Sequence, residues 1–211
     1  MKYDAIYFDL DGTLWDATDV SLDCANVVSK KYNLDLISRA AIEQTMGKTQ
    51  EECVEIVYPN LPYNEGLAYL DEVMELTTQR LKTQGGKVYE GLEETLKELI
   101  NRNYKLGIVS NCLAGYIEAF MISSGLGKYF NDIVAAGKKE IKKSDAIKLA
   151  IERDGVRNAI YVGDTTKDKE AAEGAGLEFI HAKYGFEKDL YSEYSINSIK
   201  ELPNFMSKID S

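Results

Sequence analysis

The chain has 211 residues, of which 45% are hydrophobic and 28% are charged, and its formal net charge at pH 7 is −10. This length suits one globular unit with an insertion, or a large domain with a small one. The acidic balance argues against binding of a nucleic acid polymer, and no apolar stretch is long enough to predict a membrane span. The start MKYDAIYFDLDG is too acidic for a signal peptide, and three cysteines without CxxC favour a reducing, cytoplasmic setting.

The first half of the chain changes character once. Residues 3–9 (YDAIYFD) are apolar and aromatic and predict a buried strand. From about residue 16 the apolar residues recur at helical spacing instead. This spacing is clearest in the segments 21–32, 49–58 and 66–82. We therefore expect an all-helical insertion of four or five helices, forming a separate helical domain over residues 16–86.

After residue 86, short apolar runs alternate with amphipathic segments. The runs that predict strands are 104–111, 131–136, 159–164 and 177–182. The segments that predict helices are 92–103, 115–125, 145–155, 167–176 and, at the end, 197–209. Strands that alternate with helices of this length are typical of a parallel, doubly wound α/β sheet. We expect residues 1–15 and 87–211 to form this Rossmann-like core domain.

Three of the predicted strands end in polar side chains. Because the carboxyl ends of parallel strands lie on one edge of the sheet, these side chains are expected to converge there. They are Asp9 and Asp11 after the first strand, Ser110 and Asn111 after the second, and Asp164 and Asp168 after the strand over 159–164. Four carboxylates in one crevice demand a cation, and an all-oxygen site that also admits a phosphate suits Mg²⁺.

In these motifs the sequence resembles the haloacid dehalogenase superfamily, in its phosphoglycolate phosphatase-like branch. The family motif DxDx[TV] stands at residues 9–13 and GDxxxD at residues 163–168, with Ser110 as the second motif. The resemblance covers nearly the whole chain, and the helical insertion is similar to the C1 cap of this branch. The third motif, a lysine before a helix, lacks its usual proline in IKKSDAIKLA; Lys143 fits best, and Lys142 stays an alternative.

The resemblance implies an Mg²⁺-dependent phosphatase of a small phosphorylated metabolite, which acts through an aspartyl-phosphate. Asp9 would be the nucleophile and a metal ligand. Asp11 would bind the metal through its backbone carbonyl and use its side chain as acid and base. Asp164 would be a further ligand, and Asp168 would act through a water molecule or by orienting Asp164. Phosphoglycolate, sugar phosphates and nucleotides all remain possible substrates.

The same resemblance assigns residues to the substrate. Those expected to hold the phosphoryl group are Gly12, Ser110, Asn111 and Lys143. Gly12 is expected to be small because the backbone approaches the phosphate closely. Lys48 lies in the loop where related enzymes place specificity residues, and it is a candidate contact to a substrate carboxylate or second anion. The alternative for Lys48 is an ordinary solvated lysine.

Two other functions are compatible with this fold. A phosphosugar mutase of the β-phosphoglucomutase type would carry an arginine in the cap loop, whereas GKTQEE has Gln50 and no arginine. A catalytically inactive binding protein is argued against by the intact Asp9, Asp11 and Asp164. A dehalogenase would lack the second acid. We expect no nucleic acid polymer and no membrane as partners, and a monomer or homodimer.

Overall fold

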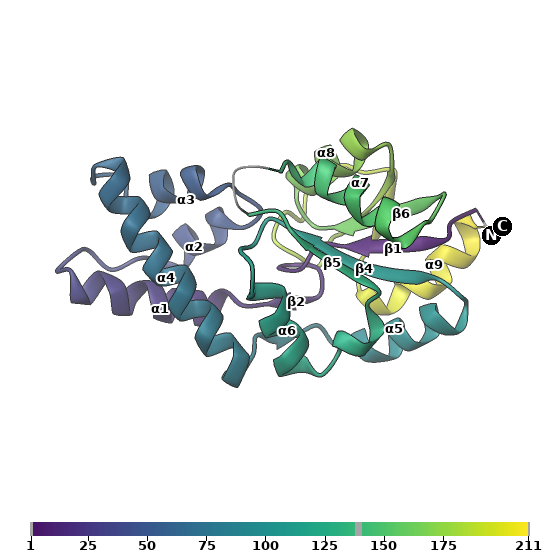
Figure 1. Ribbon diagram of the computed structural model, residues 1–211, viewed down its shortest axis with the longest axis horizontal. Coiled ribbons are helices and arrows are strands. Elements are labelled where there is room, and N and C mark those ends of the chain that lie inside the picture. Colours follow the sequence, from purple (N-terminus) through teal and green to yellow (C-terminus); the bar gives the residue numbers. More distant parts are fainter. Residues whose placement is uncertain (1, 138–140, 211) are drawn as a thin grey trace.

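The computed structural model describes residues 2–137 and 141–210. Within these residues the central feature is a six-stranded sheet with the strand order β5-β4-β1-β6-β7-β8, in which all neighbours are parallel (Figure 1). The strands are β1 (Ala5–Phe8), β4 (Lys105–Ser110), β5 (Asp132–Ala135), β6 (Ala159–Gly163), β7 (Glu178–Ala182) and β8 (Tyr194–Ile196). The doubly wound α/β class predicted from the sequence is confirmed.

Strand β1 lies inside the sheet and is buried on both faces. Ile6 and Phe8 belong to a hydrophobic cluster on one face, whereas Ala5 and Tyr7 belong to a cluster on the other. Figure 1 shows α7 and α8 over one side of the sheet and α5 and α9 over the other. The helices of this part are α5 (Leu92–Asn101), α6 (Tyr116–Ser124), α7 (Lys143–Asp154), α8 (Thr166–Ala175) and α9 (Leu202–Ile209).

A separate group of helices follows the first strand, at the left of Figure 1. They are α1 (Thr18–Lys31), α2 (Arg39–Thr45), α3 (Gln50–Val57) and α4 (Tyr63–Gln84). We call residues 16–86 the helical insertion. The chain leaves and rejoins the sheet part through β2 (Trp15–Asp16) and β3 (Lys87–Val88), which pair antiparallel. The sequence did not predict this ribbon because two-residue strands carry no readable periodicity.

Side-chain caps fix the start of two helices in the insertion. Ser38 Oγ accepts a hydrogen bond of 3.2 Å from the backbone N–H of Ala41 in α2. At the start of α3, the Thr49 N–H donates to Glu52 Oε2 (2.8 Å) and the Glu52 N–H donates to Thr49 Oγ1 (3.4 Å). Each such cap contributes about 1 kcal/mol. The insertion also has a small hydrophobic cluster of its own, made of Val54, Val57, Tyr58 and Leu70.

The C-terminal part contains elements that the sequence did not predict. Strand β8 has three residues and no long apolar run, so it lacks the usual signal of a strand. The predicted final helix over 197–209 divides into the 3₁₀ turn η2 (Ile199–Glu201) and α9, and a further turn, η1 (Gly127–Tyr129), follows α6. Over the described ranges, no helix is both long enough and apolar enough to span a bilayer.

Candidate active site

Three acidic side chains meet at the carboxyl edge of the sheet. Asp9 follows β1, Asp164 follows β6, and Asp168 lies in the first turn of α8. One carboxylate oxygen from each lies within 4.8 Å of the others, and all three side chains are buried. They come together because β1 and β6 are neighbours in a parallel sheet, so that their ends lie side by side. We call Asp9, Asp164 and Asp168 the acidic cluster.

Lys143 is the cation that faces the acidic cluster. Its Nζ lies 2.5 Å from Asp9 Oδ1 and also contacts Asp168 Oδ1, and its side chain is only 5% exposed. Burial opposes the charge of Lys143, but the carboxylates of Asp168 and Asp9 hold its pKa well above the usual range. Of the two lysines that the sequence left open, the structure brings Lys143 to the carboxylates. Lys142 is the residue before α7 and lines a neighbouring surface cavity.

Asp9 is surrounded by groups with opposite effects on its charge. Burial outweighs the opposing charge of Lys143 and, together with the charge of Asp168, raises the pKa of Asp9 to about 6. A hydrogen bond from Ser110, the last residue of β4, also favours the ionised form. At neutral pH the Asp9 carboxylate is therefore mostly ionised although it is buried, which is the form that a nucleophile or a metal ligand requires.

Asp164 is held in place by two donors. Its Oδ1 accepts a hydrogen bond from the Thr13 hydroxyl (3.2 Å) and its Oδ2 accepts one from the Phe186 N–H (2.7 Å). Burial, followed by the charges of Asp168 and Asp9, raises the pKa of Asp164 well above the usual value. Phe186 lies in the loop after β7, which the sequence analysis did not connect with the site. The residue before Phe186 is Gly185, and this glycine was the one signal that the sequence offered. In the structure a Cβ on Gly185 would lie 2.3 Å from Asp164 Cβ.

Asp168 takes part in both helix capping and charge pairing. Its Oδ2 accepts hydrogen bonds from the N–H of Thr165 (3.0 Å), the hydroxyl of Thr165 (2.7 Å) and the N–H of Asp164 (3.2 Å). Its Oδ1 contacts Lys143. Thr165 and Asp168 thereby form the capping box of α8. Asp168 is thus anchored by backbone and lysine, which suits a residue that orients its neighbours.

Gly12 packs directly against Asp164. A Cβ on Gly12 would lie 2.2 Å from Asp164 Oδ2, and its φ of +83° is in the left-handed region. Its N–H donates to Trp15 O (2.8 Å), so this donor is used within the turn. The structure therefore gives a reason for glycine other than the expected approach to phosphate: the side chain of Asp164 fills the space. The assignment of Gly12 to phosphate binding stays a prediction.

The Gly12→Ala substitution tests this packing. We expect it to destabilise the protein by about 3 kcal/mol, because it combines left-handed strain with overpacking against Asp164. Gly155→Ala is the matched control, since Gly155 also has positive φ (+62°) but no atom within 4 Å of a Cβ. The control should cost about 1 kcal/mol in urea unfolding. Equal losses in the two variants would contradict a packing role for Gly12.

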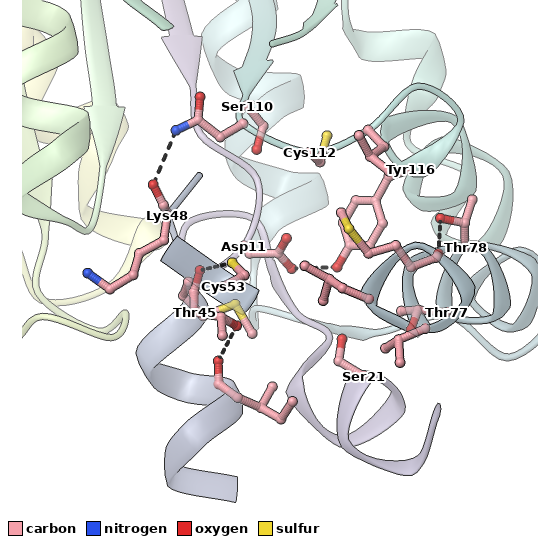
Figure 2. Close-up of a pocket in the computed structure, with 18 of the residues that line it drawn as sticks. Asp11, Ser21, Thr45, Lys48, Cys53, Thr77, Thr78, Ser110, Cys112 and Tyr116 are labelled. Carbon is pink, nitrogen blue, oxygen red and sulfur yellow. Dashed lines mark hydrogen bonds between the residues drawn. The ribbon is translucent and has the colours of Figure 1, made fainter. Parts of the chain in front are cut away.

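Asp11 is turned away from the acidic cluster. Its Oδ1 accepts a hydrogen bond of 3.1 Å from the hydroxyl of Tyr116, the first residue of α6 (Figure 2). Burial and, after it, the charge of Asp9 raise the pKa of Asp11 to about 8, although the hydrogen bond from Tyr116 opposes this rise. Asp11 therefore carries a proton at neutral pH, whereas Asp9 does not. Sequence reasoning missed Tyr116, whose only signal was its place at the start of a helix after a strand end.

A cavity of about 150 Å³ opens beside Asp9 and Asp11, between the sheet part and the helical insertion. Ser110 and Asn111 contribute to its wall on the sheet side. The Asn111 amide donates to the Gly47 carbonyl (3.2 Å) of the insertion, so it joins the two parts of the chain. Lys48 is on the cavity lining, and Figure 2 shows its ammonium group directed away from Asp11. The predicted contact of Lys48 with a substrate anion stays a prediction.

The acidic cluster fits a divalent cation. Three buried carboxylates face one lysine, so a cation would relieve the remaining negative charge. The donors are all oxygens, which suits a hard ion such as Mg²⁺ rather than a soft metal. Asp9 and Asp164 would be its ligands, and Asp168 would support them from its anchored position.

Comparisons with known proteins show the family of the chain. A family model described as haloacid dehalogenase-like hydrolase matches residues 6–182. A phosphoglycolate phosphatase of Synechococcus elongatus is 30% identical over 190 residues, which cover 86% of this chain and 84% of that protein. The pyrophosphatase PpaX of Bacillus velezensis is 30% identical over 187 residues, covering 82% of this chain and 80% of that protein.

The fold is also found among solved structures. The crystal structure of a predicted phosphoglycolate phosphatase from Haemophilus somnus superposes with a TM-score of 0.86 at 19% identity. The superposition covers 100% of this chain and 99% of that chain. At this level of identity the likeness concerns the fold, which includes both the parallel sheet and the helical insertion.

Proposed function

Because the chain belongs to the haloacid dehalogenase-like hydrolases and is a phosphatase of this family, we propose that it hydrolyses small phosphate monoesters with Mg²⁺ through a phosphorylated Asp9. The observation that carries the proposal is the convergence of the acidic cluster and Lys143 beside a cavity onto which Asp11 also faces. One site thus holds an ionised carboxylate, a protonated carboxyl and a fixed cation, which together supply a nucleophile, an acid and charge neutralisation.

In the first step, Asp9 attacks the substrate phosphorus and a bond forms between its carboxylate oxygen and phosphorus. The bond from phosphorus to the alcohol oxygen breaks, and Asp11 gives its proton to that oxygen. In the second step, water attacks the same phosphorus and gives a proton to Asp11. The Asp9–phosphorus bond then breaks, which releases inorganic phosphate and restores both carboxyl groups.

The remaining residues bind and orient. The Lys143 ammonium lies beside Asp9 and offsets negative charge that gathers on the phosphoryl oxygens. Ser110 would turn its hydroxyl from Asp9 to a phosphoryl oxygen when substrate binds, and Asn111 holds the loop of Gly47 over the site. The bound Mg²⁺ would add charge neutralisation between the ionised Asp9 and the phosphate dianion.

The helical insertion acts as a cap in this proposal, with boundaries at residues 16 and 86. Next to the site its contacts with the sheet part are polar: Lys167 of α8 pairs with Glu52 of α3, and Asn111 bonds to Gly47. Farther from the site, α4 packs against α6, and one hydrophobic cluster is continuous between the two parts. The β2–β3 ribbon joins the two parts by only two residue pairs. The α2–α3 side of the cap, which meets the sheet part through these polar contacts, would be the part that moves to admit substrate and then excludes water from the phosphorylated Asp9.

A phosphate-release assay tests the proposed function. With Mg²⁺ present, we expect release from p-nitrophenyl phosphate and from at least one member of a panel of alkyl phosphates, phosphoglycolate, sugar phosphates and nucleoside monophosphates. EDTA should abolish the release, and added Mg²⁺ should restore it, because the acidic cluster cannot hold a phosphate dianion unaided. An absence of phosphate release from every compound with Mg²⁺ would refute the proposal.

A further inference from the structure

The cavity beside Asp11 extends into the helical insertion, where its wall is mainly apolar. In Figure 2 segments of several helices lie around this side of the cavity. The wall residues from α1, α2, α3 and α4 include Ala25, Ile42, Val57, Leu70, Val73 and Met74. Most of these side chains are buried, and they also belong to the hydrophobic clusters of the protein. The leaving group of a substrate bound at Asp9 would enter this apolar region.

Few charges line this cavity. Among the described residues of its wall, the charged ones are Asp9, Asp11 and Lys48. Asp9 and Asp11 lie at the sheet end, where the phosphoryl group would bind. In Figure 2 the ammonium of Lys48 extends to the opposite side from Thr77, Thr78 and Tyr116. A second anion on the leaving group would therefore meet apolar side chains, carboxyl groups and the hydroxyls of Ser21 and Thr77, with no ammonium directed towards it among the described wall residues. The desolvation of such an unpaired charge is costly.

The hydroxyl groups of the wall are partly committed to their own helices. Thr45 Oγ1 donates to the Ile42 carbonyl (2.6 Å), and Thr78 Oγ1 donates to the Met74 carbonyl (2.9 Å). The hydroxyl hydrogen of each threonine is therefore already bonded to a backbone carbonyl. Towards the cavity these two side chains can offer only a methyl group and an acceptor oxygen. An acceptor oxygen repels a carboxylate, whereas it is compatible with an uncharged group.

From this wall, and resting on the proposed function, we infer that the preferred substrates are phosphate monoesters of uncharged, largely apolar alcohols. The inference excludes monoesters whose leaving group carries a carboxylate or a second phosphate. The substrates inferred for this chain therefore differ from the substrate in the name of its phosphoglycolate phosphatase relatives.

A pair of substrates with the same shape tests the inference. Isobutyl phosphate and phosphoglycolate both carry a planar or branched three-atom end on one methylene, but only phosphoglycolate adds a carboxylate. We expect kcat/KM to be at least about tenfold higher for isobutyl phosphate, since burial of an unpaired charge outweighs the easier departure of glycolate. A preference for phosphoglycolate would overturn the inference, and its loss in Lys48→Gln would show that Lys48 receives the carboxylate.

Two variants of the wall make the test specific to this cavity. Ala25→Val narrows it, and should lower kcat/KM for isobutyl phosphate by more than for methyl phosphate. Val73→Ala widens it, and should shift the preference towards longer alkyl phosphates. Ala40→Leu, an exposed position of α2, is the control and should leave these ratios unchanged. Unchanged ratios in both wall variants, with folding intact by thermal unfolding, would overturn the inference.

The proposed function is monitored separately with p-nitrophenyl phosphate. If this activated substrate is hydrolysed but alkyl phosphates are poorer than phosphoglycolate, the inference on specificity fails and the phosphatase proposal stands. If no phosphate monoester is hydrolysed with Mg²⁺ present, the proposed function fails, and the specificity inference fails with it.

Discussion

Asp9→Asn is expected to reduce phosphate release by at least about 10³-fold, because an uncharged amide cannot replace the attacking carboxylate. Asp9 is 6% exposed and faces both Lys143 and Ser110, so the substitution is nearly isosteric in a filled site. Lys143 keeps Asp168 as a partner, and the repulsion between Asp9 and Asp168 disappears. We therefore expect the free energy of unfolding to change by less than about 2 kcal/mol.

Steady-state rates with p-nitrophenyl phosphate and urea unfolding of the same preparation measure the two quantities. Asp145→Asn is the matched control, since Asp145 is exposed in the first turn of α7 and lies two residues from Lys143. The control should retain the wild-type rate. A rate in Asp9→Asn within tenfold of the wild type would remove Asp9 as the nucleophile, and a folded but inactive variant that still accepts phosphate covalently would point to a different residue.

The convergence of Asp9, Asp164 and Asp168 could be predicted from the sequence for a physical reason. Asp9 and Asp164 directly follow apolar runs that predict strands, and Asp168 lies at the start of the helix after the second of these runs. In a parallel sheet all such positions lie on one edge. The strand order then places β1 between β4 and β6, so the edge positions of three neighbouring strands meet. The alternation of strands and helices can be recognised from local sequence patterns. Once it indicates a parallel sheet, the site is expected at the carboxyl ends of the strands.

The choice between Lys142 and Lys143 could not be made in the same way. It depends on the residue at which α7 begins, and the bounds of elements are the least reliable feature of a sequence-based assignment. In the structure α7 begins at Lys143, and this single-residue register directs its side chain to Asp9 and Asp168.

Contacts between remote loops were also beyond sequence reasoning. Tyr116 reaches Asp11 across 105 positions of the chain, and the Phe186 N–H reaches Asp164 from a loop that follows another strand. Neither contact leaves a periodic signal. The apolar cavity wall could not be predicted for the same reason. Ala25 and Val73 follow an ordinary helical pattern in the sequence, and they face the cavity because α1 packs against α4.

Asp11→Asn is expected to lower kcat/KM most for substrates whose leaving group must be protonated as it departs. For an alkyl phosphate the alcohol leaves poorly as an alkoxide, so loss of the acid should lower kcat/KM by about 10³-fold. p-Nitrophenolate leaves without protonation, so its release in the first step should fall far less. Wild-type hydrolysis of alkyl phosphates should decline as the pH rises through about 8, where Asp11 loses its proton. The variant should lack this decline.

The second half-reaction distinguishes an acid that also acts as a base from a residue that merely shapes the site. Asp11→Asn cannot accept the proton of the attacking water, so phosphorylated Asp9 should accumulate. Rapid mixing with p-nitrophenyl phosphate should then give a burst of about one p-nitrophenolate per active site, followed by a slow steady state. Asp16→Asn, which removes a carboxylate outside the cavity, is the control and should show no burst. If Asp11→Asn lowered kcat/KM equally for alkyl and p-nitrophenyl phosphates and gave no burst, the acid–base role of Asp11 would be contradicted. A purely structural defect slows the release of both leaving groups alike.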